Sequence, residues 1–208
     1  MKKILLFIGL IAASLSTFAQ KSSFGIKGGI AFPELQISDQ SSNLSVTTGS
    51  VTSFSIGILA DCPLKGSNSS VQPGVYFTGR GGKITGDGNS SGTFNLYYAQ
   101  LPLDFVYHAK IEPGNIFIGA GPYIAIGISG KIKADDGQGN TISEDASFGS
   151  NGNFKTADAG IQGIAGLQFK KGFLIGINYD LGLTNIAQNS GSGSIKNRVF
   201  GISIGFLH

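Results

Sequence analysis

The sequence is poor in several residue types that soluble domains commonly use. Its 208 residues include one cysteine, no tryptophan, two histidines and only 13% charged residues. Soluble domains usually carry about 25% charged residues. The single cysteine, Cys62, has no partner for an internal disulfide, so burial and hydrogen bonding must stabilise the fold. Because Cys62 lies far from the N-terminus, it is also not the lipid-modified first residue of a lipoprotein.

Long apolar runs and a strong charge of one sign are missing as well. After the first twenty residues, no stretch approaches the roughly 18 apolar residues that a membrane-spanning helix needs. Apolar residues nevertheless make up 41% of the chain. A closed β-sheet can cross a membrane without such a stretch, because closure pairs every backbone donor and acceptor. The net charge of +3 is small and scattered, so no nucleic-acid partner is expected.

The N-terminal segment has the pattern of a secretory signal peptide. Lys2 and Lys3 provide the positive start, residues 4–15 form an apolar run, and Thr17-Phe18-Ala19 has the small-x-small pattern of a cleavage site. We expect cleavage after Ala19 and export through the general secretory route. Residues 1–19 are then the signal peptide, and residues 20–208 form one domain.

Alternation of large apolar residues with small or polar ones dominates the rest of the chain. In the first such segment, Phe24, Ile26, Ile30 and Phe32 fall on one face. A period of two residues is typical of β-strands. Eight strands are predicted, one from residue 24 to residue 32 and the others near 51–62, 70–80, 93–108, 115–130, 158–169, 173–184 and 198–208.

The composition of the two faces favours a barrel surrounded by lipid. One face is large and apolar over most strands, as lipid exposure requires. The opposite face is rich in glycine, of which the chain has 33 residues. Glycine weakens a strand, but it suits the crowded interior of a narrow barrel.

The connections between the predicted strands alternate between long and short. In outer-membrane barrels, long external loops alternate with short periplasmic turns. The sequence therefore predicts an all-β fold, an eight-stranded antiparallel up-and-down transmembrane β-barrel in the cell outer membrane, with both termini on the periplasmic side. The predicted external loops are 34–50, 81–92, 131–157 and 185–197, and the predicted turns are 63–66, 112–115 and 170–172.

Polar side chains of both signs are predicted to point into the lumen. They would either line a path for ions and small solutes, as in a passive porin-like channel, or fill the interior as a plug. Eight-stranded barrels are narrow and buried charges persist only when paired, so we favour the plug and a structural or surface-interaction role. The lumen-facing candidates are Lys27, Asp61, Arg80, Gln100, Asp104, Gln162, Asn178 and Asp180.

No catalytic site, metal site or cofactor is expected. His108 and His208 are both predicted at the periplasmic rim, and Asp104 lies about 13 Å along the strand from His108, beyond hydrogen-bond reach. The acidic segment 131–145 does not fit a calcium-binding loop, because position twelve counted from Asp135 is Ala146. Less favoured alternatives are a lipid-modifying barrel enzyme and a soluble periplasmic barrel with inverted faces that binds an apolar ligand. The expected partners are outer-membrane lipid, the barrel-assembly machinery and a surface partner that contacts loops 34–50 and 131–157.

Five segments in order suggest a family. They are FGIKGGIAF (24–32), YYAQLPLDFVYHAK (97–110), GAGPYIAIGISGK (119–131), GFLIGINYDLGLTNI (172–186) and RVFGISIGFLH (198–208). Their order and spacing resemble the outer-membrane β-barrel domain family of Bacteroidetes, a porin-like group that is also called PorT-like. The resemblance covers nearly all of the chain after the signal peptide. It departs at the end, where Leu207 and His208 follow the aromatic Phe206. It implies a Gram-negative outer-membrane barrel, and it does not imply a catalytic site.

Overall fold

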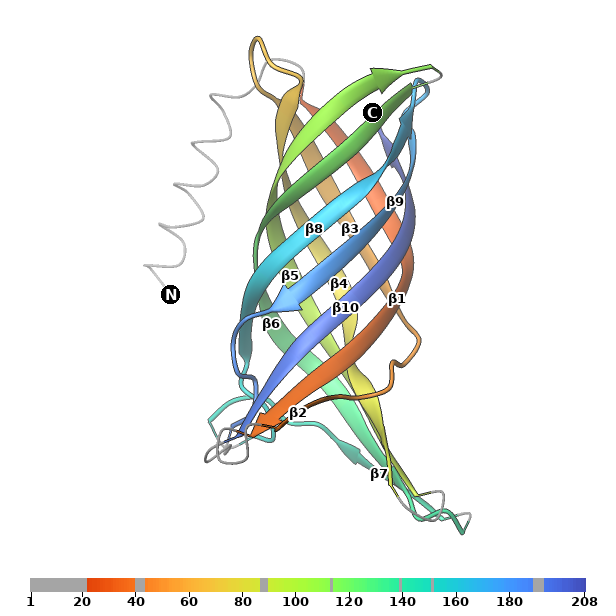
Figure 1. Ribbon diagram of the computed structural model, residues 1–208, viewed down its shortest axis with the longest axis vertical. Coiled ribbons are helices and arrows are strands. Elements are labelled where there is room, and N and C mark those ends of the chain that lie inside the picture. Colours follow the sequence, from red (N-terminus) through yellow and green to blue (C-terminus); the bar gives the residue numbers. More distant parts are fainter. Residues whose placement is uncertain are drawn as a thin grey trace.

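The protein is a closed barrel of eight antiparallel strands (Figure 1). The computed structural model describes residues 22–39, 44–86, 90–112, 114–138, 140–150, 152–188 and 193–208. Neighbouring strands of the ring follow chain order, and pairing of the last strand with the first closes it. The ring consists of β1 (Ser23–Asp39), β3 (Ser53–Pro63), β4 (Ser69–Thr85), β5 (Ser91–Ile111), β6 (Gly114–Asp135), β8 (Ala157–Phe169), β9 (Phe173–Gly182) and β10 (Gly193–Leu207).

Two short strands lie outside the ring. β2 (Leu44–Thr47) pairs with β1, and β7 (Thr141–Asp145) pairs with β6. The predicted all-β, eight-stranded antiparallel barrel is confirmed. The predicted signal peptide, residues 1–19, lies outside the described residues. Within the described ranges, no helix is long and apolar enough to span a membrane.

The outer surface of the ring is apolar. Large side chains such as Ile26, Ile56 and Leu103 are 65%, 59% and 50% exposed, and similar residues cover the outside of the other strands. Charged and amide side chains are buried on the inner side. The alternative of a soluble barrel with inverted faces is therefore wrong, because water would meet a continuous apolar belt.

The two ends of the barrel differ in their connections. At the end where the chain terminates, β8 and β9 are joined by residues 170–172 alone, with Gly172 at φ 87°. Residues 64–68 join β3 and β4, and Gly66 there has φ 75°. Such positive φ values strain residues that carry a Cβ, so glycine fits these tight turns. We call this the turn end and the opposite end the loop end.

The strands reach further at the loop end than the sequence predicted. The predicted loops 34–50, 81–92, 131–157 and 185–197 are wrong in part, because they contain paired strand residues. Beyond the lipid neither face must be apolar, so the alternation that marks a strand in the sequence fades while backbone pairing continues. The predicted turn 112–115 is also too long, since β6 already begins at Gly114.

Three ring strands, β4, β5 and β6, continue past the rim and form a projecting sheet with β7, seen at the lower right in Figure 1. We call this sheet the extension. It consists of residues 81–85 of β4, 91–95 of β5, 131–135 of β6 and all of β7.

Candidate functional site

The lumen brings together the polar side chains that the sequence placed inside the barrel. Because successive side chains of a strand alternate between its faces, each ring strand contributes every second residue to the interior. Lys27 and Asn178 are half-buried. The other six candidates, Asp61, Arg80, Gln100, Asp104, Gln162 and Asp180, are buried.

Arg80 is the most enclosed charge in the lumen. Its guanidinium forms an ion pair with Asp158, and neither side chain has measurable exposure. Its Nη2 donates a hydrogen bond to Gln100 Oε1 at 2.7 Å. The guanidinium carbon also lies 5.0 Å and 4.8 Å from the ring centroids of Tyr98 and Tyr123, so the cation sits between two aromatic rings.

The carboxylate of Asp158 is held by further donors. Asn197 Nδ2 donates to its Oδ2 at 2.9 Å, and Thr184 Oγ1 donates to its Oδ1. Asn197 belongs to β10, whereas Thr184 follows β9. The Arg80 layer, formed by Arg80, Tyr98, Gln100, Tyr123, Asp158, Thr184 and Asn197, therefore crosses the barrel from wall to wall.

A layer of amides lies next to it. Asp180 accepts hydrogen bonds from Gln100 at 3.0 Å, Gln162 at 2.7 Å and Asn178 at 3.0 Å. Gln100 contacts both Arg80 and Asp180, so it joins the two layers. Three amide donors therefore satisfy the buried carboxylate of Asp180.

Lys27, Tyr76 and Asp104 form the next layer. Lys27 Nζ lies 5.0 Å from the ring centroid of Tyr76, and its charge interacts with those of Asp104 and Asp180. The Tyr76 ring fits because glycines flank it. A Cβ at Gly57 or at Gly74 would lie 2.5 Å from a ring carbon of Tyr76, closer than atoms pack.

Apolar groups close the rest of the turn-end half. One cluster consists of Leu59, Tyr76, Leu174 and Leu207, and another of Val106, Phe117 and Ile164. At the rim itself, Asp61 accepts a hydrogen bond from Gln72 at 2.9 Å.

His108 lies at the same rim and has partners that the sequence did not predict. Its Nε2 is 2.8 Å from Ser70 Oγ and 3.7 Å from Asp61 Oδ1. A catalytic triad needs the hydroxyl and the carboxylate on opposite ring nitrogens, so that one nitrogen takes the proton while the other is held. Here both groups approach the same nitrogen, and the arrangement does not activate Ser70.

The loop end of the lumen is covered by an apolar cap. Residues of the segment after β7, among them Ala146 and Phe154, pack on Leu35, Leu96 and Tyr98 from the barrel wall. Phe154 contacts Phe94 edge to face, with ring centroids 6.3 Å apart. The cap also includes Ile186, which has no exposed surface.

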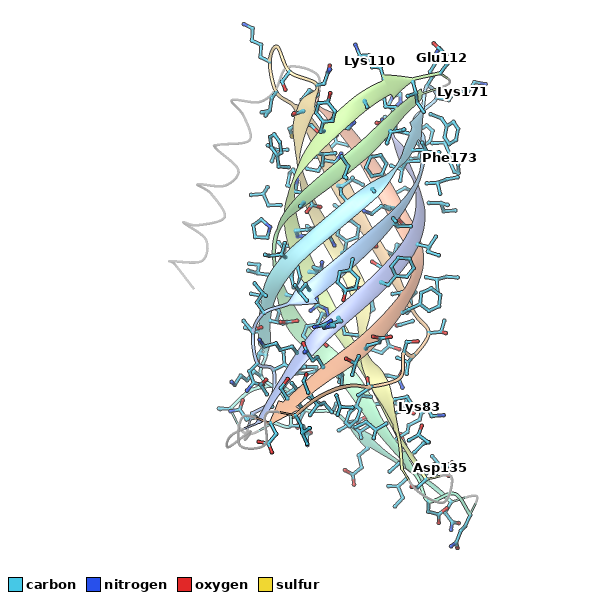
Figure 2. The ribbon with its side chains drawn as sticks, viewed as in Figure 1. Lys83, Lys110, Glu112, Asp135, Lys171 and Phe173 are labelled. Carbon is cyan, nitrogen blue, oxygen red and sulfur yellow. The ribbon has the colours of Figure 1, made fainter. Side chains whose placement is uncertain are left out.

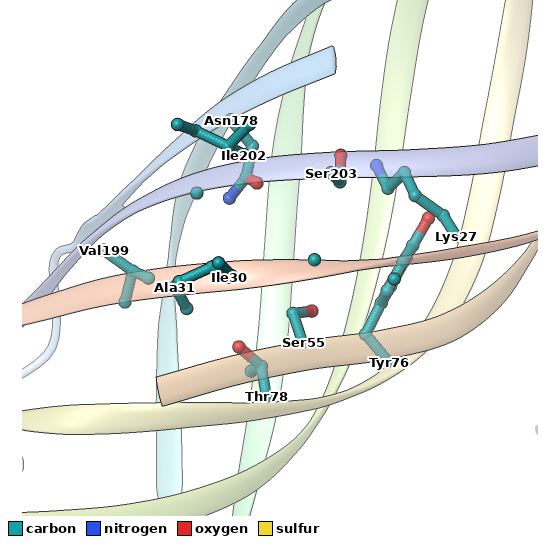
Figure 3. Close-up of a pocket in the computed structure, with 13 residues that line it drawn as sticks. Lys27, Ile30, Ala31, Ser55, Tyr76, Thr78, Asn178, Val199, Ile202 and Ser203 are labelled. Carbon is teal, nitrogen blue, oxygen red and sulfur yellow. The ribbon is translucent and has the colours of Figure 1, made fainter. Parts of the chain in front are cut away.

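The space left between these layers is small. Two cavities of about 20 Å³ each lie beside Lys27 and Tyr76, and Asn178 lines both; Figure 3 shows one of them. A volume of this size holds about one water molecule. Within the described residues, no three His, Cys, Asp or Glu side chains gather as ligands for a metal ion.

Several members of these layers were missed by the sequence analysis. Asp158 is at the start of a predicted strand, and its inward position follows from the outward Ile161 three residues later. Thr184 is the last residue of another predicted strand. Asn197 was assigned to a loop, and Ser70 lacks any local signal, because its partner His108 is 38 residues away.

A known protein family matches most of the chain. The family described as "Outer membrane protein beta-barrel domain" matches residues 18–188. Among curated proteins, none matches the chain.

Solved structures of low sequence identity also resemble it. OprG from Pseudomonas aeruginosa is 12% identical with a TM-score of 0.49, and the match covers 91% of this chain and 97% of that one. Neisserial surface protein A is 14% identical with a TM-score of 0.46, covering 90% and 98%. The outer membrane enzyme PagL is 13% identical with a TM-score of 0.44, covering 85% and 98%. These identities are too low to transfer a role from any of the three.

Proposed function

Because the chain belongs to the outer-membrane protein β-barrel domain family, we propose that it works as a closed barrel that acts through its surface and not through a pore. The barrel lies in the outer membrane. Outer-membrane barrels turn their short connections to the periplasm, so the turn end is periplasmic and the loop end, with the extension, is external.

The Arg80 layer is the observation that carries this proposal. It joins side chains from β4, β5, β6, β8 and β10 by hydrogen bonds, an ion pair and ring contacts. Opening a path here would leave Arg80 or Asp158 buried without its partner. Breaking a buried ion pair costs about 3–5 kcal/mol, so thermal motion would open such a path only rarely.

A solute-entry assay tests the proposal. Liposomes that contain the purified protein are placed in isotonic solutions of small sugars, and their swelling is followed by light scattering. We expect these liposomes to swell at the same rate as liposomes without protein. Swelling that depends on the size of the sugar would establish the alternative, a passive porin-like channel.

We also propose that the protein is not an enzyme. The support is the geometry around His108, where Ser70 and Asp61 share one nitrogen. An H108A variant should leave the acylation pattern of outer-membrane glycolipids unchanged, as judged by mass spectrometry of extracted lipid. A change in acyl-chain number would identify a lipid-modifying enzyme.

A surface partner is proposed for the two external loops 34–50 and 131–157. These segments contain β2 and β7, on which Leu44, Val46 and Ile142 are 66%, 63% and 66% exposed. Exposed apolar side chains outside the lipid belt are suited to contact with another macromolecule. Crosslinking in whole cells tests this. A crosslinker at the position of Val46 or Ile142 should capture a partner, whereas one in the periplasmic turn 64–68, the control, should not.

The remaining sequence-based expectations are proposals about origin and export. The five ordered segments support membership of the Bacteroidetes, PorT-like branch of the family. Residues 1–19 are proposed as the signal peptide, and an intact mass that begins at Gln20 would support this. Phe206, near the end of the last strand, is proposed as part of the signal read by the assembly machinery, so F206A should assemble more slowly than F200A.

A further inference from the structure

An aromatic cluster marks the outer edge of the lipid belt on one side of the barrel. Phe54, Phe77 and Tyr97 come from three neighbouring strands and point outward, with ring centroids 5.6 to 6.1 Å apart. Tyr107 points outward ten residues further along β5. At about 3.3 Å per residue and a tilt of about 40°, the two tyrosines are separated by about 25 Å in height. This equals the height of an outer-membrane apolar belt.

Three lysines follow on the same outer face, in the extension. Lys131 pairs with Asn95, and Lys133 and Lys83 pair with Thr93 from either side. Paired residues of neighbouring strands point to the same side, and Asn95 and Thr93 lie two and four residues beyond Tyr97. Lys131 is therefore about 7 Å along the strand past the aromatic edge, and Lys83 and Lys133 are about 13 Å past it. Figure 2 shows Lys83 on this part of the extension.

These lysines are exposed, and among the described residues none has an ion-pair partner. No carboxylate of the described residues lies within 4.0 Å of their ammonium groups. Asp135 is held by its own loop, because its carboxylate accepts hydrogen bonds from Gly137 N and Thr141 Oγ1. Asp145 of β7 is the register partner of Lys131 of β6, so it adds an opposing charge on this face.

The rim between β1 and β10 provides a contrast. There Phe32 and Phe200 stack with centroids 6.3 Å apart, and Arg198 follows two residues beyond Phe200. Arg198, however, lies opposite Glu34 in the register of the two strands, and its Nη2 donates a hydrogen bond to Gln36 Oε1 at 2.7 Å. The guanidinium of Arg198 therefore already donates to a neighbouring side chain of the barrel.

We propose that the patch of Lys83, Thr93, Asn95, Lys131 and Lys133 binds a phosphate group of the glycolipid in the outer leaflet. Lysine ammonium groups bind phosphate as point charges, and the Thr93 hydroxyl and the Asn95 amide add donors between them. The acyl chains would lie against the aromatic edge and the apolar belt below it. This inference rests on the outer-membrane location and is independent of whether the lumen conducts.

Native mass spectrometry of the full protein in detergent tests the proposal. The probes are a hexa-acylated disaccharide lipid carrying two phosphates and the same lipid after dephosphorylation. The K83Q/K131Q/K133Q variant should bind the phosphorylated lipid about a hundredfold more weakly, since each of the three lysines near an anionic headgroup contributes about a fivefold factor. The K110Q/K170Q/K171Q variant, which loses the same charge near the turn end, should stay within about twofold of the wild type.

Two further measurements keep the outcome decisive. D145N should bind the phosphorylated lipid more tightly, because it removes the opposing charge of the patch. Wild-type protein alone should prefer the phosphorylated lipid, and salt should weaken that preference. Equal binding of both lipids by the wild type, or equal loss in the two triple variants, would overturn the proposal.

Discussion

The guanidinium of Arg80 and the carboxylate of Asp158 face each other across the lumen, 78 residues apart in sequence and shielded completely from solvent. Each has further partners, so the pair is the centre of a layer and not an isolated contact. Together with the apolar cap and the layer of Lys27, Tyr76 and Asp104, this layer is what we propose closes the polar interior.

Loss of the cation should destabilise the barrel strongly. R80M leaves Asp158 buried without its counter-ion, and removing one partner of a buried pair costs about 3–5 kcal/mol. We expect a lower urea midpoint in lipid vesicles and a lower temperature for the shift in gel mobility. K83Q, three residues along the same strand and exposed, should match the wild type.

Neutralising the anion in the same protein should recover part of this loss. D158N keeps hydrogen-bonding groups for Asn197 and Thr184 but removes the unpaired charge. R80M/D158N should therefore be more stable than R80M alone. A double variant that is less stable than either single one would show that the charges do not act as a pair.

The glycines beside Tyr76 should tolerate no larger side chain. In G74A the new methyl group meets the Tyr76 ring, and overpacking of this kind costs about 1–3 kcal/mol. Adding Y76L should restore most of the stability. G163A is the control, because a Cβ there meets nothing within 4 Å.

The apolar cap should contribute stability without being the main barrier. F154A removes a side chain that is 4% exposed, and such changes cost about 3–5 kcal/mol. The urea midpoint should fall, while ion conductance stays at the level of the bare bilayer, because the Arg80 layer remains. A steady current through F154A would assign the barrier to the cap instead.

The loop between β6 and β7 should respond to acid. Hydrogen bonds from the Asn140 side chain and then from the backbone of Gln138 and Asn140 lower the pKa of Asp136 below its ordinary value. A lowered pKa stabilises the loop above the ordinary pKa, and the effect is lost as the pH falls through the folded value. N140A should raise the pKa of Asp136, as measured by NMR titration of its carboxyl carbon. An unchanged pKa would contradict the role of Asn140.

The sequence predicts the ring well because lipid imposes a rule on every strand. Outward Ile26 and Ile56 must be apolar, so the period of two persists and also fixes which face holds Arg80 and Asp180. The extension escapes prediction for the opposite reason. Lys131 and Lys133 alternate with Ile132, which packs against the cap and not against lipid, so this segment lacks the large outward apolar residues that mark the ring strands.

The sequence predicts which residues point into the lumen, but it does not predict which of them touch one another. Parity places Arg80 inside, but its partner is Asp158, which depends on the stagger of strands around the ring and not on local pattern. In the same way, its place at the end of a predicted strand puts His108 near the periplasmic rim, whereas its contact with Ser70 depends on the register of β4 against β5.

Single-channel recording of the wild-type protein tests the central claim most directly. The full protein is inserted into a planar bilayer in 1 M potassium chloride, and its folded state is verified by the gel-mobility shift on heating. A lumen closed by the Arg80 layer predicts a current equal to that of the bare bilayer at every voltage that the bilayer withstands. Stable unitary steps of uniform size from the wild type would contradict it, because they would require a continuous water path past Arg80 and Asp158.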